Sequence, residues 1–186
     1  ERSLAIQEEL GNKHGIGYSL NSIGGAHYYK YDYDKALDYY NRSLAIREEL
    51  GDKRGMAHSL NSIGNVHNCK GDYDKAAEHL VKSLSIQKEI ELKAIELETT
   101  TYLYLSCRHL GKDYDVKEIH SLIKKAENIK FEINLRLYEL LENKSYLETA
   151  YNQVQKKADN LEHDVAAKFL SYPIPKTIVE EWEKVK

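Results

Sequence analysis

The chain has 186 residues, of which 41% are hydrophobic and 31% charged, and its formal net charge is -3. This balance excludes a disordered chain, and the absence of a long basic run speaks against a nucleic-acid partner. No apolar run approaches the length of a membrane span, so we expect no membrane partner either.

Only two cysteines occur, Cys69 and Cys107, and the first residues are patterned like a helix rather than a signal peptide. Two cysteines do not make a disulfide framework, because such frameworks need several pairs. We therefore expect a reduced, cytoplasmic protein with half-buried thiols.

An internal repeat starts within the first ten residues. Residues 3–6 recur as 43–46 and 83–86, and residues 9–13 recur as 49–53. Residues 19–24 recur as 59–64, and residues 32–36 recur as 72–76, so every block keeps one 40-residue offset. Such self-similarity is typical of an array of stacked structural units.

Each unit is predicted to contain two helices, running from about 15 to 30 and from 33 to 50 in the first complete copy. Leu20, Ile23 and His27 follow helical spacing on one face. Asp32 and Asp72 are expected to cap the second helices at their N-termini, and Gly11 and Gly51 to end them in a left-handed conformation. The small residues Gly24, Ala36, Gly64 and Ala76 should let paired helices approach closely.

The stretch from Leu60 to Ile86 resembles the tetratricopeptide repeat family. The first-helix signature appears as Leu60, Ile63-Gly64 and His67, the turn as Gly71-Asp72-Tyr73, and the second-helix series as Ala76, Leu80 and Ser83. The long spacing is similar to the variant of kinesin light chains, spindle-orientation adaptors and bacterial regulatory proteins. Tyr31 replaces the usual turn glycine, and a positive φ there would cost on the order of 1 kcal/mol.

The resemblance implies an all-α fold, a right-handed superhelical stack of antiparallel helix pairs with a C-terminal capping helix. We predict an array over residues 1–160, with a partial repeat at 1–14, repeats at about 15–54, 55–94 and 95–129, and a degenerate repeat at 130–160. Residues 161–186 are predicted to form C-terminal capping helices, broken at Tyr172-Pro173-Ile174-Pro175 because proline removes a donor. Residues 1–10 match a second helix without its first helix, so we expect a fragment of a longer array, with self-association possible through the uncovered N-terminal end near Tyr18.

The eight histidines do not point to catalysis or metal binding. His27 and His67 take a repeat position that normally holds an aromatic packing residue, and we interpret them as packed side chains. A zinc set of His67, Cys69, Cys107 and His109 is disfavoured, because residues two apart on a helix point in different directions. No nucleophile elbow or phosphate-binding loop occurs, so we expect no enzymatic activity, cofactor or metal.

The resemblance places the functional surface on the concave face, which is lined by the first helices of successive repeats. The candidate peptide-binding residues on this face are Tyr18, Asn21, Ser22, Tyr28, Tyr29, His58, Asn61, Asn65, Asn68, Thr101, Tyr102 and Arg108. Glu98 also falls on this face. The asparagines could hold the backbone of a peptide or simply bond between helices, and the tyrosines could anchor a partner or pack between repeats. An anionic tail is disfavoured, because only Arg108 and Arg136 lie near.

Three functions fit this pattern. The chain could be a non-catalytic protein–protein interaction scaffold that grips a peptide or helical segment in the groove. It could be the regulatory or sensor domain of a larger signalling or effector enzyme, or it could be an architectural spacer. The asparagine and tyrosine lining argues against a spacer, because a spacer needs no converging side chains.

Overall fold

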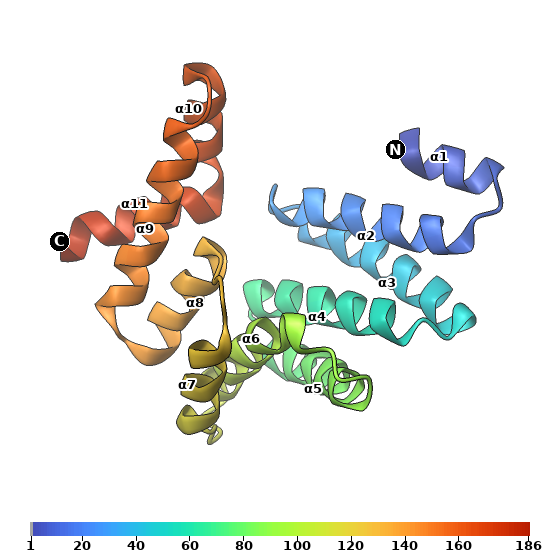
Figure 1. The fold of residues 1–186 in the computed structure, drawn as a ribbon, viewed down its shortest axis with the longest axis horizontal. Helices are drawn as coiled ribbons and strands as arrows, with labels where there is room; N and C mark the ends of the chain where they lie inside the picture. The colour runs from blue at the N-terminus through green and yellow to red at the C-terminus, as the bar shows by residue number, and fades with distance from the viewer. Residues whose placement is uncertain (1) are drawn as a thin grey trace. The chain divides into compact units, whose positions relative to one another are not determined.

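A computed structural model describes residues 2–186 as eleven α-helices and one short 3₁₀-helix, with no strand in that range (Figure 1). The chain therefore has the predicted all-α fold. It divides into two compact units, the first ending at Leu122 and the second running from Ile123 to Lys186. This boundary falls inside the predicted third repeat, 95–129, whereas the predicted division after residue 160 remains a prediction.

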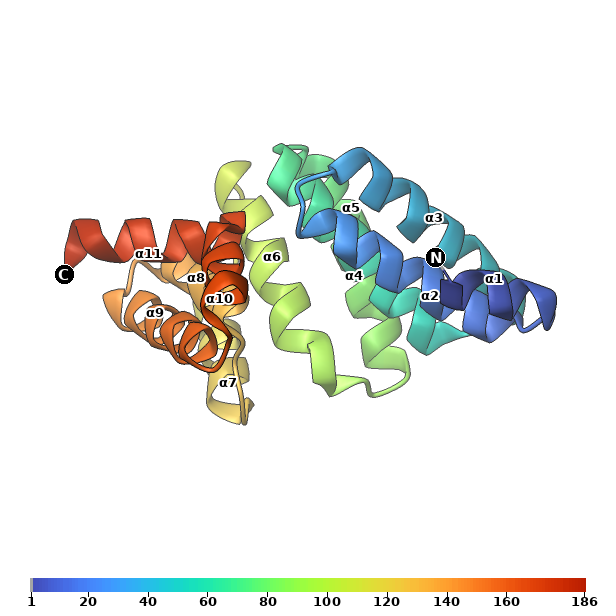
Figure 2. The same cartoon turned by 90° about the horizontal axis from the view of Figure 1, so that it is seen from above.

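The first unit is a succession of helix hairpins. Its helices are α1 Arg2–Glu9, α2 Lys13–Tyr28, α3 Tyr33–Leu50, α4 Lys53–Lys70, α5 Tyr73–Glu89, the 3₁₀-helix Lys93–Ile95, α6 Glu96–His109 and α7 Val116–Lys125, which crosses the boundary between units. Helix α2 pairs with α3, and α4 pairs with α5. Helix α3 also packs on α4, and α5 on α6, so each second helix joins its own repeat to the next (Figures 1 and 2).

The turns follow the sequence prediction closely. Gly11 and Gly51 have φ values of 61° and 65°, so both end their helices in the left-handed conformation as predicted. Tyr31 has a φ of 61° where the next repeat has Gly71 at 79°. The tyrosine therefore keeps the backbone of a glycine turn, at a steric cost of about 1 kcal/mol.

The helix caps differ from the prediction. Asp32 and Asp72 stand at the N-cap positions of α3 and α5, but neither makes a side-chain capping bond. The Asp72 carboxylate lies 3.2 Å from His67 at the end of the preceding helix. The Asp32 carboxylate lies 2.7 Å from Lys35 and 3.3 Å from His27. A side-chain cap is found instead on the first helix of the repeat. Asp52 stands at the N-cap of α4, and its Oδ1 accepts a 2.9 Å hydrogen bond from the Gly55 amide.

Small residues set the distance between paired helices. A Cβ atom at Gly24 would lie 2.7 Å from the Tyr40 ring, and one at Gly64 would lie 2.5 Å from Leu80 Cγ. Ala36 and Ala76 on the facing helices are fully buried. The predicted close approach of the first two pairs is thus confirmed.

The third pair cannot approach in the same way, because Tyr104 stands at the equivalent position. Its ring tilts against Tyr114 at 5.3 Å, and its hydroxyl donates to Glu118 on α7. A tyrosine between two helices holds them apart. Helix α7, with ten residues, is also much shorter than α3 and α5.

The second unit has its own helices and core. Its helices are α8 Phe131–Leu141, α9 Lys144–Asp159, α10 His163–Ser171 and α11 Pro173–Val185. Leu147, Val154 and Ile178 are fully buried, and Trp182 of α11 stacks on Tyr151 of α9 at 5.6 Å. The chain breaks at Tyr172 and restarts with Pro173 at the first helical position, where a proline is tolerated.

Candidate protein-binding face

The first helices of the repeats form one continuous face. Helix α2 contacts α4, and α4 contacts α6, so equivalent residues of the three helices stand in rows (Figure 2). One row consists of Tyr18, His58 and Glu98, which share a single repeat position. We call this surface of α2, α4 and α6 the first-helix face.

The α2 part of the face is open. The Tyr18 side chain is 71% exposed and Ser22 is exposed, while Asn21 is half-buried. Asn21 Oδ1 accepts a 3.4 Å hydrogen bond from Ser59 Oγ. Its amide nitrogen has no partner among the described residues and can donate to a ligand.

The α4 part is closed by contacts with α6. Asn61 and Asn65 are only 4% and 8% exposed. Their Nδ2 atoms donate to the same oxygen of Glu98, Oε1, at 2.8 and 3.2 Å. The Asn68 side chain donates to the Tyr102 carbonyl at 3.0 Å and accepts from Ser106 Oγ at 3.1 Å.

The asparagines make the bonds between helices that the sequence left open as one of their two roles. All four asparagines bond between helices, although Asn21 does so only through its Oδ1 atom, and Thr101 and Tyr102 are buried too. The physical reason is that adjacent first helices touch through the positions that also face the groove. The role of all these residues in binding stays a prediction.

The tyrosines predicted as anchors meet across the three helices. The Tyr28 hydroxyl of α2 lies 3.4 Å from the Tyr102 hydroxyl of α6 and 3.5 Å from Cys69 Sγ of α4. Tyr28 also meets Tyr29 edge to face at 5.5 Å, and Tyr29 is 46% exposed. Tyr28 and Tyr102 thus contribute to packing between repeats, while Tyr29 and Arg108 remain accessible.

Burial favours the uncharged form of two side chains at this face, His58 and Tyr40. It lowers the pKa of His58, and the positive charges of Arg47 and Arg54 lower it further. Burial also raises the pKa of Tyr40 to about 12. Both side chains are therefore neutral at neutral pH.

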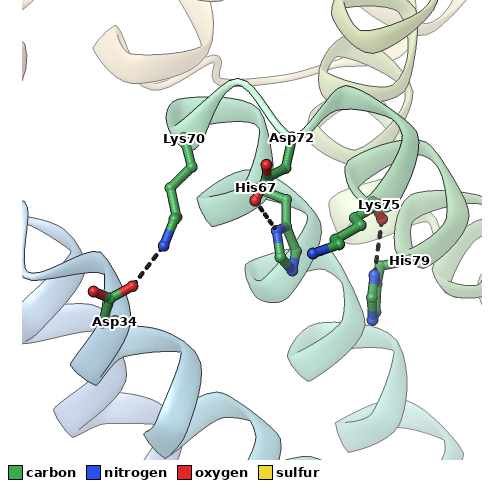
Figure 3. A network of polar contacts seen from close by, with 6 residues as sticks. All are labelled: Asp34, His67, Lys70, Asp72, Lys75 and His79. Carbon is green, nitrogen blue, oxygen red and sulfur yellow. Dashed lines mark hydrogen bonds and ion pairs between the residues drawn. The ribbon is translucent and has the colours of Figure 1, made fainter.

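The remaining histidines and cysteines do not gather into a metal site. His67 is bonded to Asp72 and stacks on His79 at 5.6 Å (Figure 3). His109 stacks on Tyr73 at 4.1 Å. Within residues 2–186 no group of three or more His, Cys, Asp or Glu side chains could hold a metal ion.

Glu98 was expected on this face but is not among the candidate binding residues predicted from the sequence. Its importance depends on its contacts with Asn61 and Asn65, which lie 37 and 33 residues away. The sequence did indicate one feature of Glu98: it is the charged residue at the repeat position that holds Tyr18 and His58 in the earlier repeats.

Comparison with known families agrees with this architecture. The model of the tetratricopeptide repeat family matches residues 16–89, the region of α2 to α5. No curated protein matches the chain. None of the helices described here is long and apolar enough to cross a membrane. Residues 16–89 are thus tetratricopeptide repeats, which are generally protein–protein interaction modules.

Proposed function

We propose that the chain is a non-catalytic scaffold that binds a peptide or helical segment of a protein partner along the first-helix face. The observation that carries this proposal is the continuity of α2, α4 and α6, which presents rows of side chains that a linear segment can follow. A regulatory array that holds an attached domain would use the same face, so the experiment below applies to both.

The open α2 end of the face is where we expect the strongest contacts. An exposed tyrosine supplies a large, partly apolar contact area at low entropic cost, which is typical of binding hot spots. Tyr18 is the most exposed tyrosine on this face. Asn21 and Ser22 lie beside it in the sequence and offer polar groups for a partner backbone.

The test begins with peptides selected from a random phage-displayed library on the purified chain. The affinity of a selected peptide, made synthetically, is then measured by fluorescence anisotropy. Tyr18→Ala and Asn21→Ala together should raise the Kd by about ten- to a hundredfold, which corresponds to roughly 1.4–2.8 kcal/mol.

Tyr172→Ala provides the matched control, because Tyr172 is another exposed tyrosine and lies in the second unit. Its Kd should equal that of the unmodified chain. If no peptide is selected, or if the Tyr18 and Asn21 changes leave the Kd unaltered while the protein stays folded, the proposal is wrong.

A further inference from the structure

Glu98 is a carboxylate fixed in place without a positive charge beside it. Its Oε1 atom accepts hydrogen bonds from both Asn61 and Asn65, and the side chain is half-buried. No lysine, arginine or histidine of residues 2–186 forms an ion pair with it. Arg47, on α3, donates to the Gly55 carbonyl and Ser59 instead.

Other carboxylates of the array are treated differently. Glu49 pairs with Lys13, Glu89 with Lys53, and Asp34 with Lys70, each across two helices (Figure 3 shows the last). These pairs recur because the repeat supplies a lysine at a fixed offset. The repeat supplies no lysine partner for Glu98. The equivalent positions in the two earlier repeats hold Tyr18 and His58, which are not carboxylates and need no such partner.

The two asparagines fix the orientation of this carboxylate. The amides cannot be reversed, because a carbonyl oxygen would then face the carboxylate. Asn61 Oδ1 and Asn65 Oδ1 are buried and have no hydrogen-bond partner among the described residues, so the two amides are held in place chiefly by their bonds to Glu98.

The second oxygen of Glu98, Oε2, has no hydrogen-bond partner among the described residues, so the carboxylate keeps an unused acceptor. A protonated lysine has three donors and an arginine has five, and neither has an acceptor. A basic side chain therefore matches both the charge and the unused oxygen of Glu98. Calcium prefers six to eight oxygens and usually several carboxylates, whereas this site has one carboxylate. An anionic ligand would be repelled.

We propose that Glu98, held by Asn61 and Asn65, binds a lysine or arginine side chain of the partner segment. This inference rests on the proposed function, since it specifies the chemistry of a partner lying on the first-helix face. The basic residue is anchored by Glu98, while residues near Tyr18 contact another part of the same segment.

The test uses the phage-selected peptides described above. They should share a Lys or Arg at one fixed position. Glu98→Gln should raise the Kd of such a peptide at least about tenfold at low salt, and its affinity should become less sensitive to salt. The isosteric Gln keeps an oxygen for Asn61 and Asn65, and a thermal melt checks that the variant stays folded.

Glu96→Gln serves as the control, because it removes the same charge from the same helix two residues away. Its Kd should equal that of the unmodified chain. A second measurement leaves the protein unaltered: replacing the fixed basic residue of the peptide by Gln should weaken binding as much as Glu98→Gln does. Combining both changes should add little further, since the two groups form one contact.

The possible outcomes separate the two proposals. Peptides that depend on Tyr18 and Asn21 but bind Glu98→Gln with unchanged affinity would overturn the assignment of Glu98 and leave the scaffold function intact. Selected peptides without a fixed basic residue would overturn it in the same way. A failure to select any peptide would overturn both.

Discussion

Histidines 27 and 67 show how single residues combine packing with polar contacts in this array. Each lies at the end of a first helix and faces the aspartate that opens the second helix. Each also stacks on a ring of the second helix, Tyr39 for His27 and His79 for His67. The predicted role of these histidines in packing is confirmed, and the same contacts explain why Asp32 and Asp72 do not cap their helices.

Burial of His58 and His67 makes the stability of the chain depend on pH. Burial lowers the pKa of both, and the hydrogen bond to Asp72 only partly opposes this for His67. The folded chain therefore binds these protons less readily than the unfolded chain, whose histidine pKa is 6.5. The contribution of these two histidines to the free energy of unfolding is therefore fully present above pH 6.5. It decreases as the pH falls from 6.5 through their lower pKa in the folded chain.

We expect the midpoint of urea unfolding of the unmodified chain to decrease as the pH is lowered from 7 toward 5. The double variant His58→Gln and His67→Gln should lose less stability over the same interval, since it lacks both groups. His163→Gln is the control, because the His163 side chain is 98% exposed. Parallel loss of stability in all three proteins would show that these histidines are not responsible.

Buried polar contacts recur within the repeats and between them. Inside a repeat, Ser43 Oγ donates to the Gly17 carbonyl at 2.7 Å, and Ser83 Oγ donates to the Ala57 carbonyl at 2.7 Å. Between repeats, Arg47 donates to the Gly55 carbonyl, and Gln87 donates to Thr99 Oγ1 at 2.8 Å. Arg47 and Gln87 thus stand at equivalent positions, and each donates a hydrogen bond to the first helix of the next repeat.

This equivalence predicts which substitutions the first interface tolerates. Arg47→Gln copies the residue of the next repeat and should change the free energy of unfolding by less than about 1 kcal/mol. Arg47→Leu removes the buried hydrogen bonds to the Gly55 carbonyl and Ser59 and should destabilise by about 1–3 kcal/mol. Urea unfolding measures both.

Arg42→Gln is the control for this pair, because Arg42 is half-exposed and its ion pair with Asp38 spans one helical turn. It should cost less than about 0.5 kcal/mol. Equal effects of Arg47→Gln and Arg47→Leu would mean that the side-chain hydrogen bonds do not stabilise the interface.

The helices of the repeats were predictable because periodic residues set them directly. The predicted second helix, 33–50, coincides with α3 Tyr33–Leu50, and the left-handed turns at Gly11, Gly51 and Tyr31 lie where the repeat placed them. The contacts of Glu98 were not predictable, because they join α4 to α6 through side chains whose spacing follows no local rule. For the same reason, the sequence could not show that Asn61 and Asn65 are buried while Tyr18 is open.

At the scale of the whole molecule, the array loses its regularity where Tyr104 replaces a glycine. The first two pairs pack around Gly24 and Gly64, and the third pair cannot. The division into two units falls within α7, directly after this loss of close packing. Each unit then has its own buried residues, including Leu80 in the first and Leu147 in the second.

We expect the two units to open with separate free energies, since stability in repeat arrays is a sum of local terms and neighbour interfaces. Leu147→Ala leaves a cavity between α8 and α9 and should destabilise its surroundings by about 2–4 kcal/mol. Native-state hydrogen exchange of the full chain should show reduced protection of amides in α9 and α11, with protection in α2 to α5 unchanged. Leu80→Ala, which is also fully buried, should produce the reverse pattern. If either variant lowers protection equally in both sets of helices, the chain opens as one cooperative unit, and the break at Tyr104 has no energetic consequence.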